Sequence, residues 1–276
     1  MLVVHASELA ACVGLNRYRP VADAAIVLFS RMNPSVYEAA MARNALREKE
    51  SIERTLEQIP GAIAAVKEAV EAAPDDLGSR IDDLIKDVGG DNQVSAADLT
   101  SLVYTERGKN AEESSLDRVQ DSWKKQITQR NTKYYKKQLS YGGERYLLLG
   151  GRVDGITDDG ELVEVKNRQR RIFSSVPIYE KVQVHAYMYL TDIKECKLVQ
   201  SFKGSDVITK ITFDDQFWND VRNRLTIFAT RMDHLCQDEK AQDSLLVQQE
   251  FPIDFQREAA HRDPSSPEVE REKPTA

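Results

Sequence analysis

The residues best suited to chemistry lie in one short stretch, where Asp154 is followed by Glu164 and then by Lys166. Glu164 and Lys166 belong to an apolar, strand-like run at 162–166, and because strand side chains alternate, the two share one face. Asp154 lies in the preceding strand-like run, 146–156, and the Asp-Asp-Gly sequence at 158–160 predicts a hairpin turn between the runs. We therefore expect Asp154 to lie beside Glu164 across the hairpin.

Two carboxylates and an ammonium group in such a hairpin suit metal-dependent hydrolysis of a phosphodiester. These charges are costly to bury unpaired, and a metal site would explain them. Clustered carboxylates can hold one or two divalent ions, which neutralise charge in the transition state and acidify a bound water. A nearby ammonium group can orient that water or stabilise charge. The alternative is an ordinary edge hairpin with a surface Glu–Lys pair, a pattern that is common by chance.

The other metal-binding residue types show no ligand spacing. The three cysteines are scattered and form no CxxC pair, so neither a zinc site nor a disulfide framework is indicated. The four histidines are also isolated. Any metal would therefore be held by carboxylates, which favours Mg²⁺ or Mn²⁺.

Basic residues are unevenly distributed, although the net charge is −7. The run 124–137 holds six basic residues and no acidic one, and the run 166–171 holds four basic residues. Either run alone is best explained as a solvated face, but two runs flanking one carboxylate cluster also suit a phosphate-binding track. If these contacts are real, affinity for DNA falls steeply with added salt. The candidate DNA contacts are Arg152, Arg168, Arg170, Arg171, Lys124 and Lys125.

The expected elements form an α/β (α+β) fold with a central mixed β-sheet flanked by helices. Helices are expected at 8–13 with Ser7 as N-cap, at 21–32, after Pro177 and at about 214–237, with strands at 134–141, 196–202 and 207–213. A helical pattern from 96 to about 129 is expected to break near Gly108. Residues 37–100 read as a helical insertion in a domain spanning 1–250, and the tail 251–276 is expected to be disordered.

No long apolar run suggests a membrane span, and the first residues lack the features of a secretory signal or a transit peptide. The sequence therefore predicts an intracellular protein, cytoplasmic or nuclear, without a membrane partner. A chain of 276 residues, 41% of them hydrophobic, can bury a sizeable core.

The spacing of Asp154, Glu164 and Lys166 resembles the PD-(D/E)XK nuclease superfamily, with Val153 where the family name has proline. Downstream, Gln183-Val-His-Ala-Tyr187 resembles the QxxxY motif of the RecB-like and lambda-exonuclease-like branch, although QxxxY alone is frequent on half-buried helices. On a helix these two side chains face the same way. The resemblance implies a restriction-endonuclease-like core.

Two upstream segments extend the resemblance. Arg107-Gly-Lys-Asn-Ala-Glu112 is similar to the family's Gly-x-x-x-Glu helix start, whose glutamate contributes to the metal site. Glu113 follows directly and is the alternative ligand, but the spacing favours Glu112. The N-terminal residues, with His5-Ala-Ser7 and Gly14-Leu-Asn-Arg-Tyr18, resemble the opening of YqaJ-type viral recombinase exonucleases. That segment lies near bound DNA in the family, so the resemblance implies that Ser7 is a further DNA contact.

The resemblance implies a role for each residue. Glu112, Asp154, Glu164 and the Val165 carbonyl would bind metal, Lys166 would assist the attacking water, and Gln183 and Tyr187 would support the site. It implies a Mg²⁺- or Mn²⁺-dependent DNA exonuclease acting on duplex ends in recombination, repair or viral DNA processing. An annealing-protein partner and a homo-oligomer are further implications. The alternatives are a catalytically inactive DNA-binding or recombination-partner module on the same fold, and a helical scaffold at 37–100 that carries a nuclease-like domain.

Overall fold

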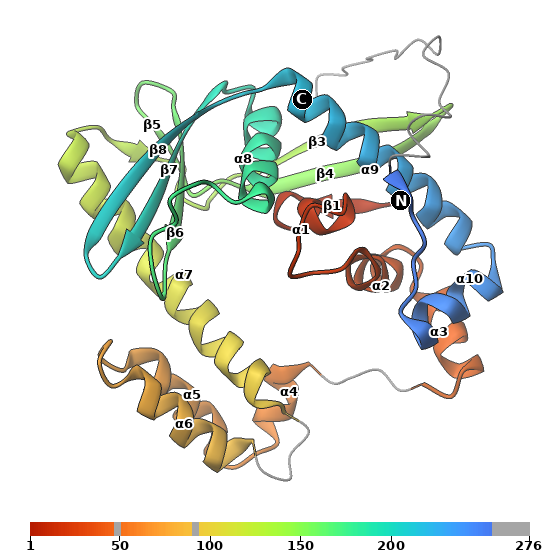
Figure 1. Ribbon diagram of the computed structural model, residues 1–276, viewed down its shortest axis with the longest axis horizontal. Helices are drawn as coiled ribbons and strands as arrows, with labels where there is room; N and C mark the ends of the chain where they lie inside the picture. The colour runs from red at the N-terminus through yellow and green to blue at the C-terminus, as the bar shows by residue number, and fades with distance from the viewer. Residues whose placement is uncertain (47–50, 90–93, 256–276) are drawn as a thin grey trace.

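The computed structural model describes residues 1–46, 51–89 and 94–255 and has two β-sheets with helices packed around them (Figure 1). The chain passes from the smaller sheet to the larger one at residues 153–154, between β4 (Arg145–Arg152) and β5 (Gly155–Thr157). Parallel and antiparallel strand pairs both occur. The fold therefore belongs to the α/β class, with mixed sheet flanked by helices, as the sequence predicts.

The five-stranded sheet has the order β2-β5-β6-β7-β8. Its central strands, β6 (Leu162–Asn167) and β7 (Glu195–Phe202), run parallel because helix α8 (Ile178–Thr191) connects them as a crossover. Antiparallel pairs complete the sheet, with β2 (Ile127–Thr128) and β8 (Ser205–Thr212) at its two edges. The predicted hairpin is confirmed, because β5 and β6 pair on either side of the 158–160 turn.

The three-stranded sheet has the order β1-β4-β3. β3 (Tyr134–Gly142) pairs antiparallel with β4, and β1 (Val3–His5) pairs parallel with β4 on the other side. The sequence did not predict β1, because three residues carry too little pattern and the strand exists only through its pairing with β4. Helix α1 (Ala6–Cys12) follows at once, so the predicted N-cap at Ser7 is wrong and His5 takes that position.

The main hydrophobic core lies between the sheets and the helices α1, α2 (Val21–Met32), α8 and α9 (Asp215–Leu235). Helix α8 is central to it (Figure 1) and buries most of its side chains, since it packs on α1, β4 and β7. Phe29 and Phe228 are fully buried in this core. The boundaries of α2 match the predicted helix, and those of α8 and α9 lie close to the predicted ones.

Helix α7 (Ala96–Trp123) covers, with its C-terminal half, the face of the five-stranded sheet opposite to α8. Its Leu116 and Val119 pack there on the valines of β6 and β7. The predicted break at Gly108 is wrong and the helix ends before the predicted residue 129. A glycine inside a helix costs only about 1 kcal/mol relative to alanine, and α7 is held at both ends by separate cores.

The N-terminal half of α7 joins α4 (Ile52–Glu57), α5 (Ala62–Glu71) and α6 (Leu77–Val88) in a helical unit that stands apart from the sheets in Figure 1. This unit has its own apolar core. Arg107 of α7 closes the C-terminal end of α5 by donating to the carbonyls of residues 70 and 72, both at 2.7 Å.

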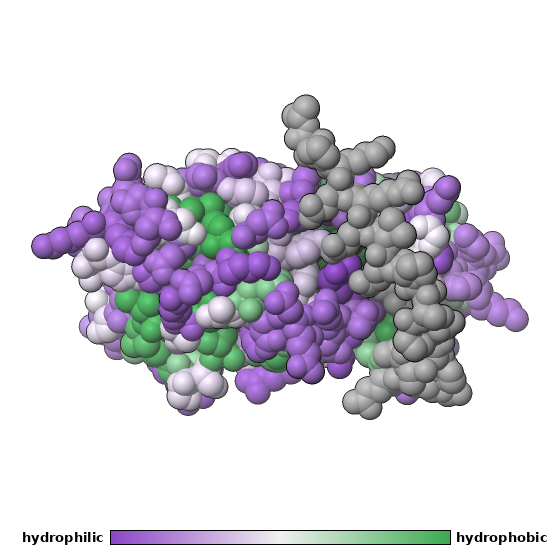
Figure 2. Space-filling model, turned by 90° about the horizontal axis from the view of Figure 1, so that it is seen from above, coloured by the Kyte–Doolittle hydropathy of each residue, from purple (hydrophilic) through white to green (hydrophobic). Residues whose placement is uncertain are grey.

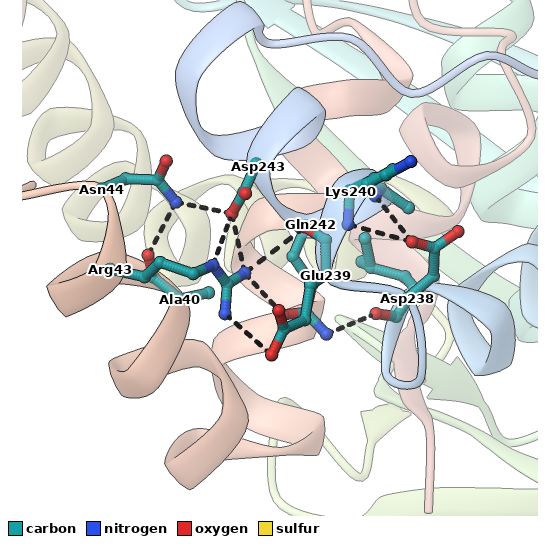
Figure 3. Close-up of polar contacts among 10 residues, drawn as sticks. Ala40, Arg43, Asn44, Asp238, Glu239, Lys240, Gln242 and Asp243 are labelled. Carbon is teal, nitrogen blue, oxygen red and sulfur yellow. Dashed lines mark hydrogen bonds and ion pairs between the residues drawn. The ribbon is translucent and has the colours of Figure 1, made fainter.

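Helix α3 (Pro34–Arg43) belongs with the main body rather than with this unit, since it packs on α2 and on α10 (Glu239–Asp243). Figure 3 shows the polar contacts, in which Arg43 donates to Asp243 at 2.7 Å and to Gln242 at 3.1 Å. Asn44 also donates to Asp243, at 2.6 Å. Residues 37–43 of α3 fall within the range 37–100 expected to form a helical insertion, but they pack on the main body.

Residues 251–255, at the start of the segment predicted to be disordered, have a defined position in the structure. The Phe251 ring lies 5.6 Å from that of Phe228, so the first residues of this segment pack on the core. Residues 256–276 lie outside the described residues.

Polar and charged side chains cover most of the face shown in Figure 2, with hydrophobic side chains showing between them. Within the described ranges, none of the helices has the length and apolar character needed to cross a membrane.

Candidate active site

The site is built around the point where the chain leaves one sheet and enters the other. Strand β4 ends at Arg152, and β5 begins at Gly155, whose pairing partner in β6 is Val163. This register places Asp154 next to Glu164, and Asp154 Oδ2 accepts a hydrogen bond of 2.8 Å from the Val165 backbone N–H. The expected position of Asp154 beside Glu164 is confirmed. The predicted continuous strand at 146–156 is interrupted here.

Glu164 and Lys166 share the face of β6 that points towards α8, as strand alternation predicts. Glu164 is 2% exposed, and its Oε1 accepts a hydrogen bond of 2.7 Å from Lys166 Nζ. Its other oxygen, Oε2, is buried and has no hydrogen-bond partner among the described residues. A buried carboxylate oxygen without a partner costs free energy, so its retention here calls for a ligand.

Burial determines much of the electrostatics of Asp154, Glu164 and Lys166. Burial raises the pKa of Glu164 to about 8, and the neighbouring Asp154 carboxylate adds to the effect. Burial also raises the pKa of Asp154 to about 7, with Glu112 as the next contributor. Burial alone would lower the pKa of Lys166, but the Glu164 and Asp154 carboxylates outweigh it and raise the pKa above its ordinary value. The lysine therefore favours its charged form, and burial disfavours two negative carboxylates side by side, a cost that a further bound cation would relieve.

Helix α8 supports β6 on the face that carries Glu164 and Lys166. Gln183 Oε1 accepts a hydrogen bond of 3.1 Å from Lys166, and Gln183 Nε2 donates to the Tyr187 hydroxyl at 3.1 Å. The two residues do face the same way, as expected for that spacing on a helix. Gly151 makes room for this arrangement, because a Cβ there would lie 2.8 Å from Tyr187 Cε1.

Glu112 reaches the site from α7 and is half-buried. It lines an open pocket of about 220 Å³ between α7 and the end of β6, together with Gly108, Lys166 and Asn167. The Glu112 carboxylate accepts a hydrogen bond of 3.2 Å from Asn131 Nδ2. The alternative ligand, Glu113, is exposed and lies 3.6 Å from Arg130, so the structure favours Glu112.

This donor set suits a hard divalent cation, because it consists of carboxylates, and one of their oxygens has no partner within residues 1–46, 51–89 and 94–255. As the side chains lie, the described residues contain no group of three His, Cys, Asp or Glu side chains arranged as a metal cluster. The buried pair of Asp154 and Glu164 therefore forms the centre of the candidate site, and Glu112 faces it from α7. The Val165 carbonyl lies in the same strand and stays a predicted ligand.

Two of the predicted phosphate contacts have other roles. Arg168 makes a bidentate ion pair with Glu180 of α8 at 2.6 and 2.7 Å, and its third nitrogen donates to Gln200. Its side chain is 9% exposed, so it is a buried structural residue rather than a free cation. Lys125 pairs with Asp159 and with Glu161 beyond the far end of β6. In both cases the positive charge is already paired with carboxylates from another part of the sequence.

The remaining predicted contacts are exposed. Arg170 and Arg171 follow the end of β6, and Lys124 ends α7. Ser7 lies in the first turn of α1, and Arg152 stacks over the Tyr134 ring at 5.7 Å, at the end of β4 next to Asp154. These side chains keep the exposure that a phosphate contact needs, and that role stays a prediction.

Sequence reasoning missed the residues that fix α7 to the site. Asn167 donates to the Gly108 carbonyl at 3.0 Å and accepts from Ser115 at 2.8 Å, which ties α7 to the end of β6. Asn131 contacts Glu112. An asparagine directly after the Glu-x-Lys pattern was the visible signal for Asn167, whereas Asn131 has no local signal that links it to a glutamate nineteen residues away.

Comparison with known proteins gives weak similarities. No protein-family model matches the chain, and no curated protein does. An alkaline exonuclease from Laribacter hongkongensis, solved alone and in complex with dAMP, is 16% identical over 71% of this chain and 100% of that chain, with a TM-score of 0.38. A phage-related exonuclease from Haemophilus somnus 129PT is 15% identical over 90% of this chain and 97% of that chain, with a TM-score of 0.40. At this level of similarity neither structure carries an argument about the activity of this chain.

Proposed function

We propose that this protein is a divalent-metal-dependent nuclease that hydrolyses DNA phosphodiester bonds. The observation that supports this best is the buried Asp154–Glu164 pair beside Lys166, in which one Glu164 oxygen has no hydrogen-bond partner in the described part of the chain. Such a group costs folding free energy, which favours a functional role for it, and metal-dependent phosphodiester hydrolysis can use carboxylates beside an ammonium group.

Asp154, Glu164 and Glu112 would hold Mg²⁺ or Mn²⁺, and the bound ion would supply Lewis-acid stabilisation of the phosphate and acidify a water. Because both buried carboxyl groups have raised pKa values, ion binding must release protons from them. Binding should therefore strengthen as the pH rises.

Lys166 keeps its proton, since the adjacent carboxylates raise its pKa. We assign it the donation of hydrogen bonds to the attacking water or to a phosphate oxygen, a role that the protonated form can fill. Gln183 fixes the ammonium group through a hydrogen bond of 3.1 Å, and Tyr187 in turn fixes Gln183. The proposal extends to an end-dependent exonuclease, intracellular, in recombination, repair or viral DNA processing. An annealing-protein partner and a homo-oligomer also belong to this proposal and follow from the resemblance of the motifs.

The test is cleavage of end-labelled linear duplex DNA in Mg²⁺, Mn²⁺ or EDTA, with circular duplex as a control substrate. The variants are Lys166→Ala and the shape-preserving Lys166→Gln, with Lys210→Ala as the matched control, since Lys210 is an exposed lysine on β8. We expect metal-dependent loss of linear DNA by the wild type and the control only.

Cleavage of circular DNA as well would replace the exonuclease with an endonuclease. Binding without cleavage by the wild type in every metal would reject the nuclease and leave a DNA-binding module on this fold. Unchanged cleavage by both Lys166 variants, with folding verified by circular dichroism, would refute the proposed reaction centre.

A further inference from the structure

The loop between β2 and β3 connects the two halves of the candidate site. Asn131 donates its backbone N–H to the Val153 carbonyl at 3.1 Å, at the residue before Asp154. Its side-chain Nδ2 donates to Glu112 Oε2 at 3.2 Å. One residue therefore contacts both the turn that carries Asp154 and the carboxylate that comes from α7.

The neighbouring Arg130 holds this loop on α7. Its guanidinium group pairs with Asp117 at 2.6 Å and donates to Gln120 at 3.0 Å, and both partners lie on α7 after Glu112. The same side chain donates to the carbonyl of Ile127 in β2, the strand before the loop, at 3.2 Å. The loop is thus fixed to the helix independently of Asn131, so the position of the Asn131 amide is defined relative to Glu112.

The residue type fits both tasks. Asn131 has a φ of 49°, in the left-handed region that asparagine and glycine adopt most readily. Its amide group also supplies an N–H donor for the half-buried Glu112 carboxylate. A glycine at position 131 would adopt the same positive φ but would offer no side-chain donor to Glu112. Replacing Asn131 with glycine therefore tests the hydrogen bond to Glu112 separately from the backbone conformation.

We propose that Asn131 is a positioning residue, which orients Glu112 towards the Asp154–Glu164 pair and thereby sets the affinity of the site for a divalent cation. This inference rests on the proposed function, because it takes Glu112 to be a metal ligand. Hydrogen bonds that orient a ligand typically change metal affinity by about 10- to 100-fold when they are removed. The hydrogen bond to Glu112 is single and exposed, so an effect at the lower end is expected.

The experiment is calorimetric titration of the full-length, DNA-free protein with Mn²⁺. The variants are Asn131→Gly, Glu112→Gln and the double variant. The matched control is Gln249→Gly, which also replaces an amide residue of positive φ, here 56°, in another part of the fold. Asn131→Ala is a second variant, which removes the same amide but strains the backbone. We expect Asn131→Gly to weaken Mn²⁺ binding about 10-fold, and Asn131→Ala to match it with a lower unfolding midpoint.

The double variant separates positioning from a general effect on the fold. If Asn131 acts through Glu112, its replacement causes no further loss of affinity once Glu112 is glutamine. An equal loss in both backgrounds would overturn the inference, as would unchanged Mn²⁺ affinity in Asn131→Gly while Glu112→Gln binds weakly. Both of those outcomes leave the proposed function intact. Absence of Mn²⁺ binding by the wild type at millimolar concentration would instead overturn the proposed function and the inference with it.

Discussion

Replacing Glu164 with glutamine should stabilise the metal-free protein while abolishing metal-dependent cleavage. Glu164 is 2% exposed, one of its oxygens has no partner among the described residues, and burial raises its pKa from 4.5 to about 8. Glutamine preserves the shape and keeps an oxygen that accepts from Lys166, but it never ionises. The change removes a charge that the fold disfavours and that the proposed reaction needs.

The magnitude follows from the shift in pKa. At neutral pH the unfolded chain ionises Glu164, so folding must add a proton, at a cost of about 1.4 kcal/mol for each pH unit above the ordinary pKa. At pH 7 this amounts to about 3 kcal/mol. Part of the gain is lost because the glutamine amide brings N–H donors into this buried position, where an unpaired donor costs free energy. We expect a net stabilisation of about 1–2 kcal/mol, or about 2–8 °C in Tm for a chain of this size.

The pH dependence gives the sharper measurement. A carboxyl group with a raised pKa contributes stability that is fully present below 4.5 and is lost as the pH rises to about 8. The gain from Glu164→Gln should therefore be small at about pH 5 and largest above about pH 8. The assay is thermal unfolding in EDTA, followed by circular dichroism across this range.

Glu161→Gln is the matched control, because hydrogen bonds from Lys197 and Lys125 lower the pKa of Glu161 despite its partial burial. That substitution should destabilise the protein at neutral pH, the opposite sign to Glu164→Gln. If Glu164→Gln is no more stable than the wild type above about pH 8, or if its gain shrinks as the pH rises, the carboxylate pair is not disfavoured in the fold and the reasoning fails.

Three further outcomes are expected. Arg168→Gln should lose about 3–5 kcal/mol in urea unfolding, because it leaves buried Glu180 unpaired; a stable variant with a weaker salt dependence of DNA binding would restore the phosphate role. Gly151→Ala should lower the free energy of unfolding by about 1–3 kcal/mol and slow cleavage, since the new Cβ meets Tyr187 at 2.8 Å. Unchanged cleavage kinetics would show that the position of the Tyr187 ring is not constrained. Burial lowers the pKa of His185, so its contribution to stability is full above pH 6.5 and is lost as the pH falls through its lower folded pKa. In His185→Gln, Tm should no longer fall over that acidic range through this residue. A profile of Tm against pH identical to that of the wild type would contradict this.

The sequence by itself determined the local geometry of the candidate site. Strand alternation placed Glu164 and Lys166 on one face, and the hairpin signal placed Asp154 opposite Glu164. The spacing of Gln183 and Tyr187 gave a shared helix face, where the two side chains are hydrogen bonded. These predictions succeed because the periods of strand and helix act over a few residues, and their signals lie entirely within the segments concerned.

Only the tertiary structure decided which charges are free and which are paired. Arg168 pairs with a carboxylate of α8, and Lys125 pairs with Asp159 and Glu161 between β5 and β6, so neither basic run is the uniform track that composition suggested. Burial likewise set the pKa values of the carboxyl groups, which sequence cannot give because desolvation depends on what packs around them.

The same holds for the elements that carry the site. Strand β1 forms only by pairing with β4, and α7 continues through Gly108 because separate cores hold its two halves. Asn131 reaches Glu112 only after the loop is fixed against the helix. Each of these depends on contacts between segments that are distant in sequence, and such contacts are defined by the packing of the whole chain.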